Sequence, residues 1–223
     1  FFDVKAFGAE FAYTVDGGAV NEINYECFNA CSAEVTIKGV NIHPGTAKNI
    51  MKNAALIATE FAALLPPAET PSHTEGREGF YHLASIEGDE VKASLKYILR
   101  DHDRARFEMR KEQVLDAAVF LNGRYGDGTV SVALKDTYYN MRDEIDRHPE
   151  VVRRAMDGMR AVGVEPAAVP IRGGTDGSRL TYMGLPCPNL PTGAYNMHGV
   201  MEYVSVPELE TVTRLLIELM KAH

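Results

Sequence analysis

The middle of the chain alternates between strand-like and helix-like patterns of apolar residues. Residues 33–40 alternate apolar and polar side chains, as a half-exposed strand does, and His43-Pro44-Gly45 ends this pattern. The full series is a strand at 33–40, a helix at 46–65, strands at 80–87 and 91–99, a helix at 104–121 and a strand at 129–135. This order predicts a ferredoxin-like split βαβ fold, a four-stranded antiparallel sheet backed by two helices.

Two helices in this series have an apolar face at helical spacing. The first is expected to bury Ile50, Ala54, Ile57, Ala58, Phe61 and Leu65, and Pro66-Pro67 ends it. The second is expected to bury Phe107, Val114, Leu115, Ala118 and Leu121.

The flanking segments have the pattern of an α/β domain in two pieces. Residues 11–15 form a short apolar strand that runs directly into Asp16-Gly17-Gly18. After residue 140 come an amphipathic helix at 149–162, a strand at 167–171, a short helix at 175–183, a buried strand at 187–190 and a closing helix at 206–222. We therefore expect three segments, 1–27, 28–140 and 141–223, of which the middle one is an insertion. The chain begins with Phe1, so we also expect the first piece to be truncated.

Composition narrows the classes of function. The 223 residues are 45% hydrophobic and carry a formal net charge of -8 with no basic cluster, which argues against a nucleic-acid partner. No run approaches the roughly 20 apolar residues that a membrane span needs. The three cysteines, Cys27, Cys31 and Cys187, include no CxxC pair, which is typical of the reducing cytoplasm and gives no sign of a zinc ribbon or a cysteine protease.

Three short motifs carry candidate chemistry. His198 lies in PCPNLPTGAYNMHG, a segment too rich in Pro and Gly for a helix or strand interior, where a His often binds a metal or a substrate or transfers a proton. IRGGTDG at 171–177 reads as the end of a strand, a glycine turn and a helix start. Asp16 follows a buried strand, where α/β folds place ligands. The alternatives are an exposed loop around His198 and a plain turn at Asp16.

Seven motifs in order carry a family resemblance. They are AYTVDGG, NIHPGTAKNIMKNA, EGFYHLAS, YYNMR, PIRGGTDG, MGLPCPNL and YNMHG. Together they resemble the C-terminal part of the peptidase T family, tripeptide aminopeptidases of the di-zinc metallopeptidase superfamily, over essentially the whole chain. The resemblance implies an α/β catalytic domain with an inserted ferredoxin-like lid that also mediates dimerisation.

The resemblance also implies roles for individual residues. Asp16 would bind one zinc and His198 the other, and carboxylate oxygen and imidazole nitrogen are ordinary zinc donors. His43 would reach the active site of a partner subunit and hydrogen-bond the scissile carbonyl oxygen, although an exposed turn is the alternative. Arg172 would bind a substrate carboxylate.

Further substrate contacts are implied around these residues. Backbone and hydroxyl donors would come from Gly173, Gly174 and Thr175. Arg100, Asn140 and Arg142 complete the implied set, although an Arg at a strand end is more often a solvated ion-pair partner.

The family's complete site needs more than this sequence contains. A His, a metal-bridging Asp and a Glu-Glu pair that includes the general base are missing, which leaves two of about five metal ligands. We therefore expect part of a zinc-dependent enzyme that releases the N-terminal residue of tripeptides, inactive alone and dimeric through segment 28–140. The alternative is an isolated lid and dimerisation module that binds no metal and makes only protein contacts.

Overall fold

The chain forms two compact units. The computed structural model describes residues 2–221. Unit 1 comprises the residues up to Phe28 and from Tyr139 onward, and unit 2 comprises Asn29–Tyr138. The expected insertion boundaries, 28 and 140, lie one and two residues outside unit 2.

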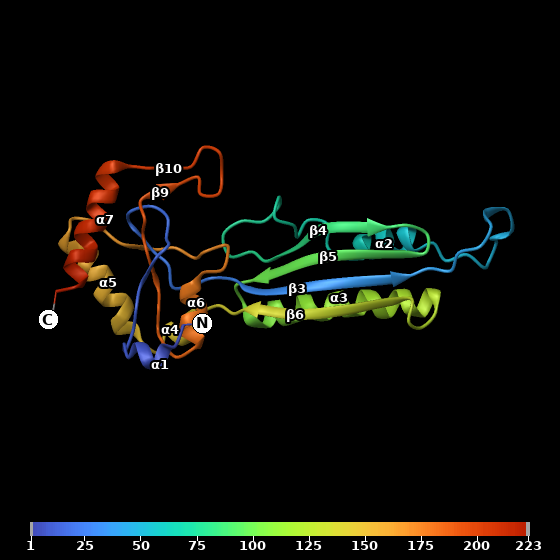
Figure 1. Cartoon of the computed structure of the whole chain (residues 1–223), viewed down its shortest axis with the longest axis horizontal. Helices are drawn as coiled ribbons and strands as arrows, with labels where there is room; N and C mark the ends of the chain where they lie inside the picture. Colours follow the sequence, from blue (N-terminus) through green and yellow to red (C-terminus); the bar gives the residue numbers. More distant parts are fainter. Residues whose placement is uncertain (1, 222–223) are drawn as a thin grey trace. The chain divides into compact units, whose positions relative to one another are not determined.

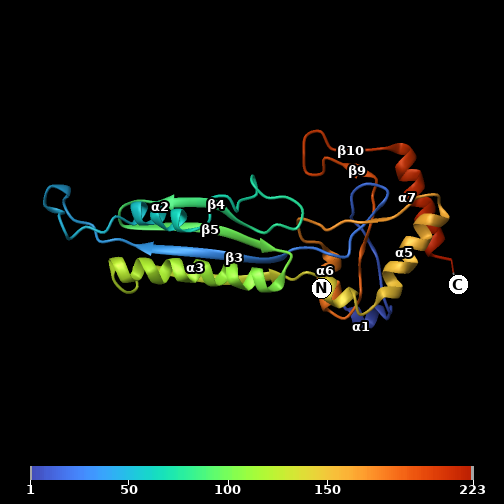
Figure 2. The ribbon, with the colours of Figure 1, turned by 180° about the vertical axis from the view of Figure 1, so that it is seen from behind.

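Unit 2 is a four-stranded antiparallel sheet with two helices on one face (Figures 1 and 2). In spatial order its strands are β4 (Phe80–Gly88), β5 (Lys92–Asp101), β3 (Asn29–Lys38) and β6 (Val130–Tyr138). The helices are α2 (Ala54–Leu64) and α3 (Arg104–Tyr125). The two outer strands, β4 and β6, are the edges of the sheet, and the ferredoxin-like order expected from the sequence is confirmed.

The core of unit 2 lies between the sheet and its helices. Along β3 the side chains of Val35 and Ile37 are fully buried on the face that carries the helices, whereas Glu34 points to the opposite face and is exposed. The largest fully buried side chains of the helices and β5 are Phe61, Phe107, Ile57, Leu121, Leu95 and Leu99. The period of two along the strands and the period of 3.6 along the helices therefore turn their apolar residues to one common layer.

The first predicted helix begins later than expected. Residues Pro44–Thr46 form a single 3-10 turn, and Asn49 has a φ of +62°, in the left-handed region that ends a right-handed helix. The helix begins only after Asn53, whose side chain accepts a hydrogen bond from Leu56 N at 3.1 Å. Ile50 is accordingly 51% exposed. The prediction that this side chain is buried was wrong.

The second helix is longer than predicted and one of its expected core residues is outside the core. It extends to Tyr125 and ends before Gly126, whose φ is +100°. Leu115 is 41% exposed, because it follows Val114 directly and lies about 100° further around the helix.

Unit 1 is built from helices and very short strands. The strands pair as β1 (Thr14–Val15) with β8 (Asn189–Leu190), β2 (Glu22–Ile23) with β7 (Ala167–Ala168), both parallel, and β9 (Ala194–Tyr195) with β10 (Tyr203–Val204), antiparallel. The helices are α1 (Val4–Phe7), α4 (Arg142–Ile145), α5 (Pro149–Ala161), α6 (Asp176–Tyr182) and α7 (Val206–Leu219). Predicted strands 11–15, 167–171 and 187–190 thus shorten to two residues each. In the last two, Pro170 and Pro188 cannot donate a ladder hydrogen bond.

Two apolar clusters hold unit 1 together, a smaller one of Cys27, Met141 and Ile145 and a larger one. In the larger cluster, Ile23 of β2, Leu190 of β8, Ala155 and Met159 of α5 and Leu215 of α7 are all buried and in contact. Residue 222, the predicted end of the closing helix, lies outside the described residues. Within residues 2–221, no helix is long and apolar enough to cross a membrane.

Candidate functional site

Asp16 lies at the carboxyl end of β1, with its side chain exposed. The turn after it is fixed by Gly17, whose N donates to Leu190 O at 2.8 Å. A Cβ on Gly17 would lie 2.7 Å from the same oxygen, so this position requires glycine. The close approach holds the Asp16 turn against the end of β8.

His198 lies on the loop between β9 and β10, also exposed. Its φ is +64°, and its N donates to Glu202 Oε2 at 2.8 Å. Asn196, with a φ of +54°, donates from its side chain to Met201 O at 3.3 Å. Two non-glycine residues in the left-handed region within three positions give this loop a specific, internally bonded shape.

Hydrogen bonds join the Asp16 turn to the base of the His198 hairpin. Thr192 donates from Oγ1 to Gly17 O at 2.6 Å and from N to Gly18 O at 3.2 Å. Gly193 N donates to Gly18 O at 3.0 Å. The two chain segments that carry the predicted zinc ligands are therefore bonded neighbours. Among residues 2–221, however, no three His, Cys, Asp or Glu side chains gather in a group that could hold a metal ion.

The glycine turn from Arg172 to Thr175 follows β7 and begins α6. Arg172 is half-buried, with its guanidinium carbon 5.2 Å from the centre of the Phe28 ring, and Phe28 N donates to Gly173 O at 3.3 Å. Gly174 is exposed. Thr175 caps α6, and its hydroxyl donates to Asn189 Oδ1 at 2.9 Å.

Asn140 and Arg142 hold the backbone where the two pieces of unit 1 meet. Asn140 is only 7% exposed, and its Oδ1 accepts from Cys27 N at 3.0 Å and from Arg142 N at 3.1 Å. Its carbonyl oxygen accepts from the Tyr182 hydroxyl at 2.8 Å. Arg142 forms an ion pair with Glu26 at 3.2 Å. These contacts give both residues a structural role in this unit.

His43 and Arg100 belong to unit 2 and lie at opposite ends of its sheet. Arg100 of β5 pairs with Ala30, near the start of β3, whereas His43 follows Lys38 at the end of β3. The eight residue-to-residue steps from Ala30 to Lys38 span about 26 Å at ~3.3 Å per step. The His43 loop leaves the sheet at that far end (Figure 1).

Each of these two side chains has a defined local partner. His43 Nδ1 accepts a hydrogen bond from Gly45 N at 3.1 Å, so Nε2 carries the ring proton and is the available donor. The ring is exposed and borders a cavity of about 430 Å³ that Met51 and Glu90 also line. Arg100 donates to the Tyr138 hydroxyl, with its guanidinium carbon 5.4 Å from the centre of that ring.

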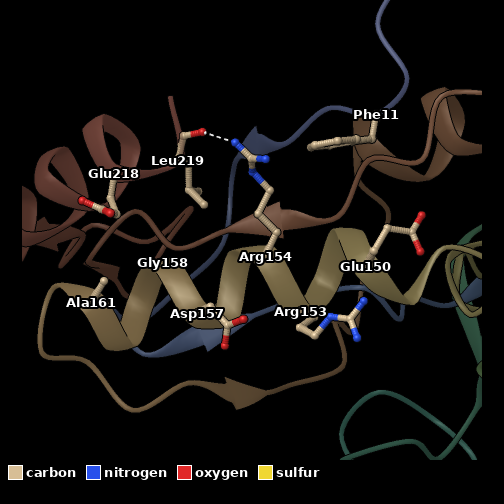
Figure 3. A pocket seen from close by; sticks show the side chains of 9 residues that line it. All are labelled: Phe11, Glu150, Arg153, Arg154, Asp157, Gly158, Ala161, Glu218 and Leu219. Carbon is tan, nitrogen blue, oxygen red and sulfur yellow. Dashed lines mark hydrogen bonds between the residues drawn. The ribbon is translucent and has the colours of Figure 1, made fainter. Parts of the chain in front are cut away.

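Unit 1 also contains a larger cavity. It measures about 540 Å³ and lies between α5 and the end of α7, beside Phe11 (Figure 3). Arg154 reaches across it from α5 and donates to Leu219 O at 3.0 Å, closing the last turn of α7. No predicted site residue lines this cavity. Its polar groups are Arg and carboxylate side chains of the two helices, which is typical of a helix-packing groove.

The sequence-based expectations missed Asn189, Thr14 and Thr192. All three bond to the Asp16 turn or to residues next to it. Asn189 had one available signal, since it is a polar residue inside the buried segment CPNL. Thr14 and Thr192 had no such signal in the sequence.

Comparisons with known proteins find similarity to peptidases. A family model described as "Peptidase dimerisation domain" matches residues 25–125. Peptidase T of Bacillus licheniformis is 53% identical over 220 residues, which are 99% of this chain and 54% of that protein. Peptidase T of Halothermothrix orenii is 50% identical over 222 residues, covering 100% of this chain and 54% of that protein. The chain therefore spans about half the length of the curated relatives it matches.

Solved structures agree in fold. Aminopeptidase PepT from Bacillus cereus superposes with a TM-score of 0.83 at 20% identity, covering 98% of this chain and 58% of that chain. A tripeptidase from Staphylococcus aureus superposes with a TM-score of 0.85 at 20% identity, covering 99% and 58%. At this identity the likeness describes the fold alone, and it includes both the α/β part and the inserted sheet.

Proposed function

Because this chain belongs to the peptidase T family, we propose that it forms part of an aminopeptidase that releases the N-terminal residue of tripeptides. The observation that carries the proposal is the hydrogen-bonded junction between the Asp16 turn and the base of the His198 hairpin, through Thr192 and Gly193. A carboxylate and an imidazole on adjacent turns are suited to a centre of two zinc ions, with Asp16 binding one ion and His198 the other.

Zinc is the metal that fits these donors. Asp16 offers carboxylate oxygens and His198 an imidazole nitrogen, and both side chains are exposed. Zinc, when bound, supplies Lewis-acid polarisation of the scissile carbonyl. A zinc site takes at least three protein ligands, so Asp16 and His198 form part of a set. We assign the remaining ligands and the general base to the part of the relatives' length that this chain does not match.

Arg172 is the proposed anchor for the substrate carboxylate. Its planar guanidinium presents parallel N–H donors to a carboxylate, and stacking over Phe28 fixes the plane. Gly173 and Gly174 allow a peptide to approach the backbone closely. The Thr175 hydroxyl is already bonded to Asn189, so its role lies in holding the turn.

His43 and Arg100 support a site shared between two subunits. An extended tripeptide spans at most ~11 Å, much less than the ~26 Å of strand between the positions of Arg100 and His43. One peptide can therefore contact both residues only when they come from different chains. We propose a homodimer through unit 2, in which His43 Nε2–H of one chain donates to the developing oxyanion in the site of the other.

The zinc ligands are tested in a chimera that joins this chain to the unmatched part of the Bacillus licheniformis relative. Asp16→Ala and His198→Ala should each lower the zinc content and abolish tripeptide hydrolysis. Asp157→Ala, which removes an exposed carboxylate of unit 1 that pairs with Arg160, serves as the matched control and should leave both unchanged. Full hydrolysis with normal zinc content in either ligand variant would refute the assignment.

Subunit mixing tests the shared site. His43→Ala and Arg100→Ala homodimers should both be slow, since loss of one oxyanion donor typically lowers kcat by about 10²–10³. In a heterodimer of the two variants, one site receives an intact His43 and an intact Arg100, so up to half of the activity should return. Proven heterodimers that stay inactive would show that His43 acts within its own chain or not at all.

A second candidate function is a module that makes only protein contacts. The match of residues 25–125 to a dimerisation domain favours it. It predicts that the chimera binds no zinc at Asp16 and His198 while the chain still dimerises, and metal analysis of the purified chimera separates the two candidates.

A further inference from the structure

Asn189 connects three of the sequence motifs inside unit 1. It belongs to the MGLPCPNL motif, it is 0% exposed, and it lies on β8 opposite Thr14 of the AYTVDGG motif. Its side chain also meets Thr175 of the GGTDG motif. The proposed function gives this residue no task.

The Asn189 amide binds two hydroxyl groups. Its Oδ1 accepts from Thr14 Oγ1 at 2.5 Å and from Thr175 Oγ1 at 2.9 Å. Thr175 Oγ1 in turn lies 3.5 Å from Asp16 Oδ2. The amide is therefore one hydroxyl group away from a proposed zinc ligand.

The backbone of β8 leads to the same turn. Asn189 N donates to Asn24 O at 2.7 Å and its O accepts from Asn24 N at 3.1 Å, so its main chain is fixed on both sides. The next residue, Leu190, accepts from Gly17 N at 2.8 Å. Gly177 approaches so closely that a Cβ there would lie 2.9 Å from Asn189 Oδ1. These contacts leave the amide little freedom to move.

The other end of the amide carries an unused donor. Within the described part of the chain, Asn189 Nδ2 is buried and has no hydrogen-bond partner. The unpaired Nδ2 costs free energy, so this end of the amide does not explain why Asn occupies the position. The two hydroxyl groups that donate to Oδ1 do explain it.

We propose that Asn189 is a positioning residue for the Asp16 carboxylate, acting through the Thr175 hydroxyl. The amide oxygen accepts a hydrogen bond from the Thr175 hydroxyl and so fixes the rotamer of that side chain, whose oxygen limits the orientation of Asp16. This inference rests on the assignment of Asp16 as a zinc ligand in the proposed function. Partners one contact removed from a metal ligand typically change metal affinity or activity by 10–100-fold when they are lost.

The test measures zinc affinity of the chimera by competition with a chromophoric chelator, which does not depend on activity. Asn189→Ala should weaken zinc binding by about 10–100-fold. Thr175→Val, which removes only the hydroxyl, should have a similar effect, and the double variant should bind zinc no more weakly than the weaker single variant. Thr175→Ser keeps the hydroxyl and should bind zinc as the parent chimera does.

The control is Ser178→Ala on the same helix. Ser178 is 0% exposed and donates to Tyr139 O at 2.7 Å, so the variant loses a buried hydrogen bond without touching the Asp16 turn. Its zinc affinity should be unchanged even where its melting temperature falls. If Asn189→Ala does not fold, Thr175→Val and Thr175→Ser test the same contact between Asn189, Thr175 and Asp16, because Thr175 is partly exposed and easier to replace.

Three results would overturn the inference. These are parental zinc affinity in Asn189→Ala or Thr175→Val, equal losses in Asn189→Ala and Ser178→Ala, and fully additive losses in the double variant. Asp16→Ala in the same assay distinguishes a failure of the proposed zinc site from a failure of the role of Asn189. If Asp16→Ala binds zinc normally, the proposed function fails and this inference with it. If Asp16→Ala loses zinc while Asn189→Ala and Thr175→Val bind it normally, only the role of Asn189 is refuted.

Discussion

Replacing Arg110 by Met should destabilise unit 2 strongly, because it leaves a buried carboxylate without its cation. The side chains of Arg110 and Asp101 are only 7% and 2% exposed, and Arg110 Nε lies 2.8 Å from Asp101 Oδ2. Arg110 also pairs with Glu69 and stacks over Tyr81, 4.9 Å from the ring centre. Burial alone would lower the pKa of Arg110, but its hydrogen bonds to Asp101 and Glu69 raise that pKa above its ordinary value.

The size of the effect follows from what remains in Arg110→Met. Asp101 keeps one hydrogen bond, from Asp103 N to its Oδ1 at 3.0 Å. Removing one partner of a buried ion pair typically costs about 3–5 kcal/mol. Glu69 is 44% exposed and can be hydrated, so its lost partner adds less than about 1 kcal/mol. With a urea m-value of about 2 kcal/mol/M, the unfolding midpoint of unit 2 should fall by about 2 M.

Urea unfolding followed by far-ultraviolet circular dichroism measures this midpoint. The matched control is Arg124→Met on the same helix, where the pair with Glu60 is 59% and 25% exposed and should contribute less than about 1 kcal/mol. Asp101→Asn combined with Arg110→Met removes the orphaned charge and should recover much of the loss. The reasoning is refuted if Arg110→Met unfolds at the same urea concentration as Arg124→Met, or if the double variant is no more stable than Arg110→Met.

Three further outcomes can be measured on the same chain. Gly123→Ala places a Cβ in open space in the last turn of α3 and should stabilise by about 0.5–1 kcal/mol, whereas Gly158→Ala places a Cβ 2.8 Å from Leu219 Cδ2 and should destabilise. Urea midpoints that move in the same direction would contradict this. Burial raises the pKa of Tyr97 to about 12, so stability should be complete below about pH 10 and fall as the pH rises toward 12, and the fall should be smaller in Tyr97→Phe. Burial raises the pKa of Cys187 to about 11, so this thiol should react with a disulfide reagent only after unfolding, and rapid modification of native protein would contradict its burial.

The fold of unit 2 was predictable because its patterns are long and regular. Strands of nine or ten residues alternate clearly, and α3 has 22 residues, so the order of elements follows from periodicity alone. The start of α2 was not predictable in this way. The segment before it is apolar at helical spacing, and only the left-handed Asn49 and the Asn53 cap exclude it from the helix.

The candidate site was only partly visible in the sequence. Asp16 and His198 lie in motifs that stand out by their glycines, whereas the bonds that join their segments come from Thr192 and from backbone groups. Such contacts link residues about 175 positions apart, and no local pattern encodes them. The separation of His43 from Arg100 also needed the strand register, because sequence distance carries no information about which end of a sheet a residue occupies.

The two ends of unit 2 lie side by side, and this has an evolutionary consequence. Ala30, just inside the insertion, pairs with Tyr138 at its other end. In unit 1 the two flanking segments are also joined, through Cys27 N and Asn140 Oδ1 at 3.0 Å. An insertion with adjoining ends disturbs its host no more than a hairpin turn would. The whole sheet with its helices can therefore be gained or lost as one block without a break in the α/β scaffold.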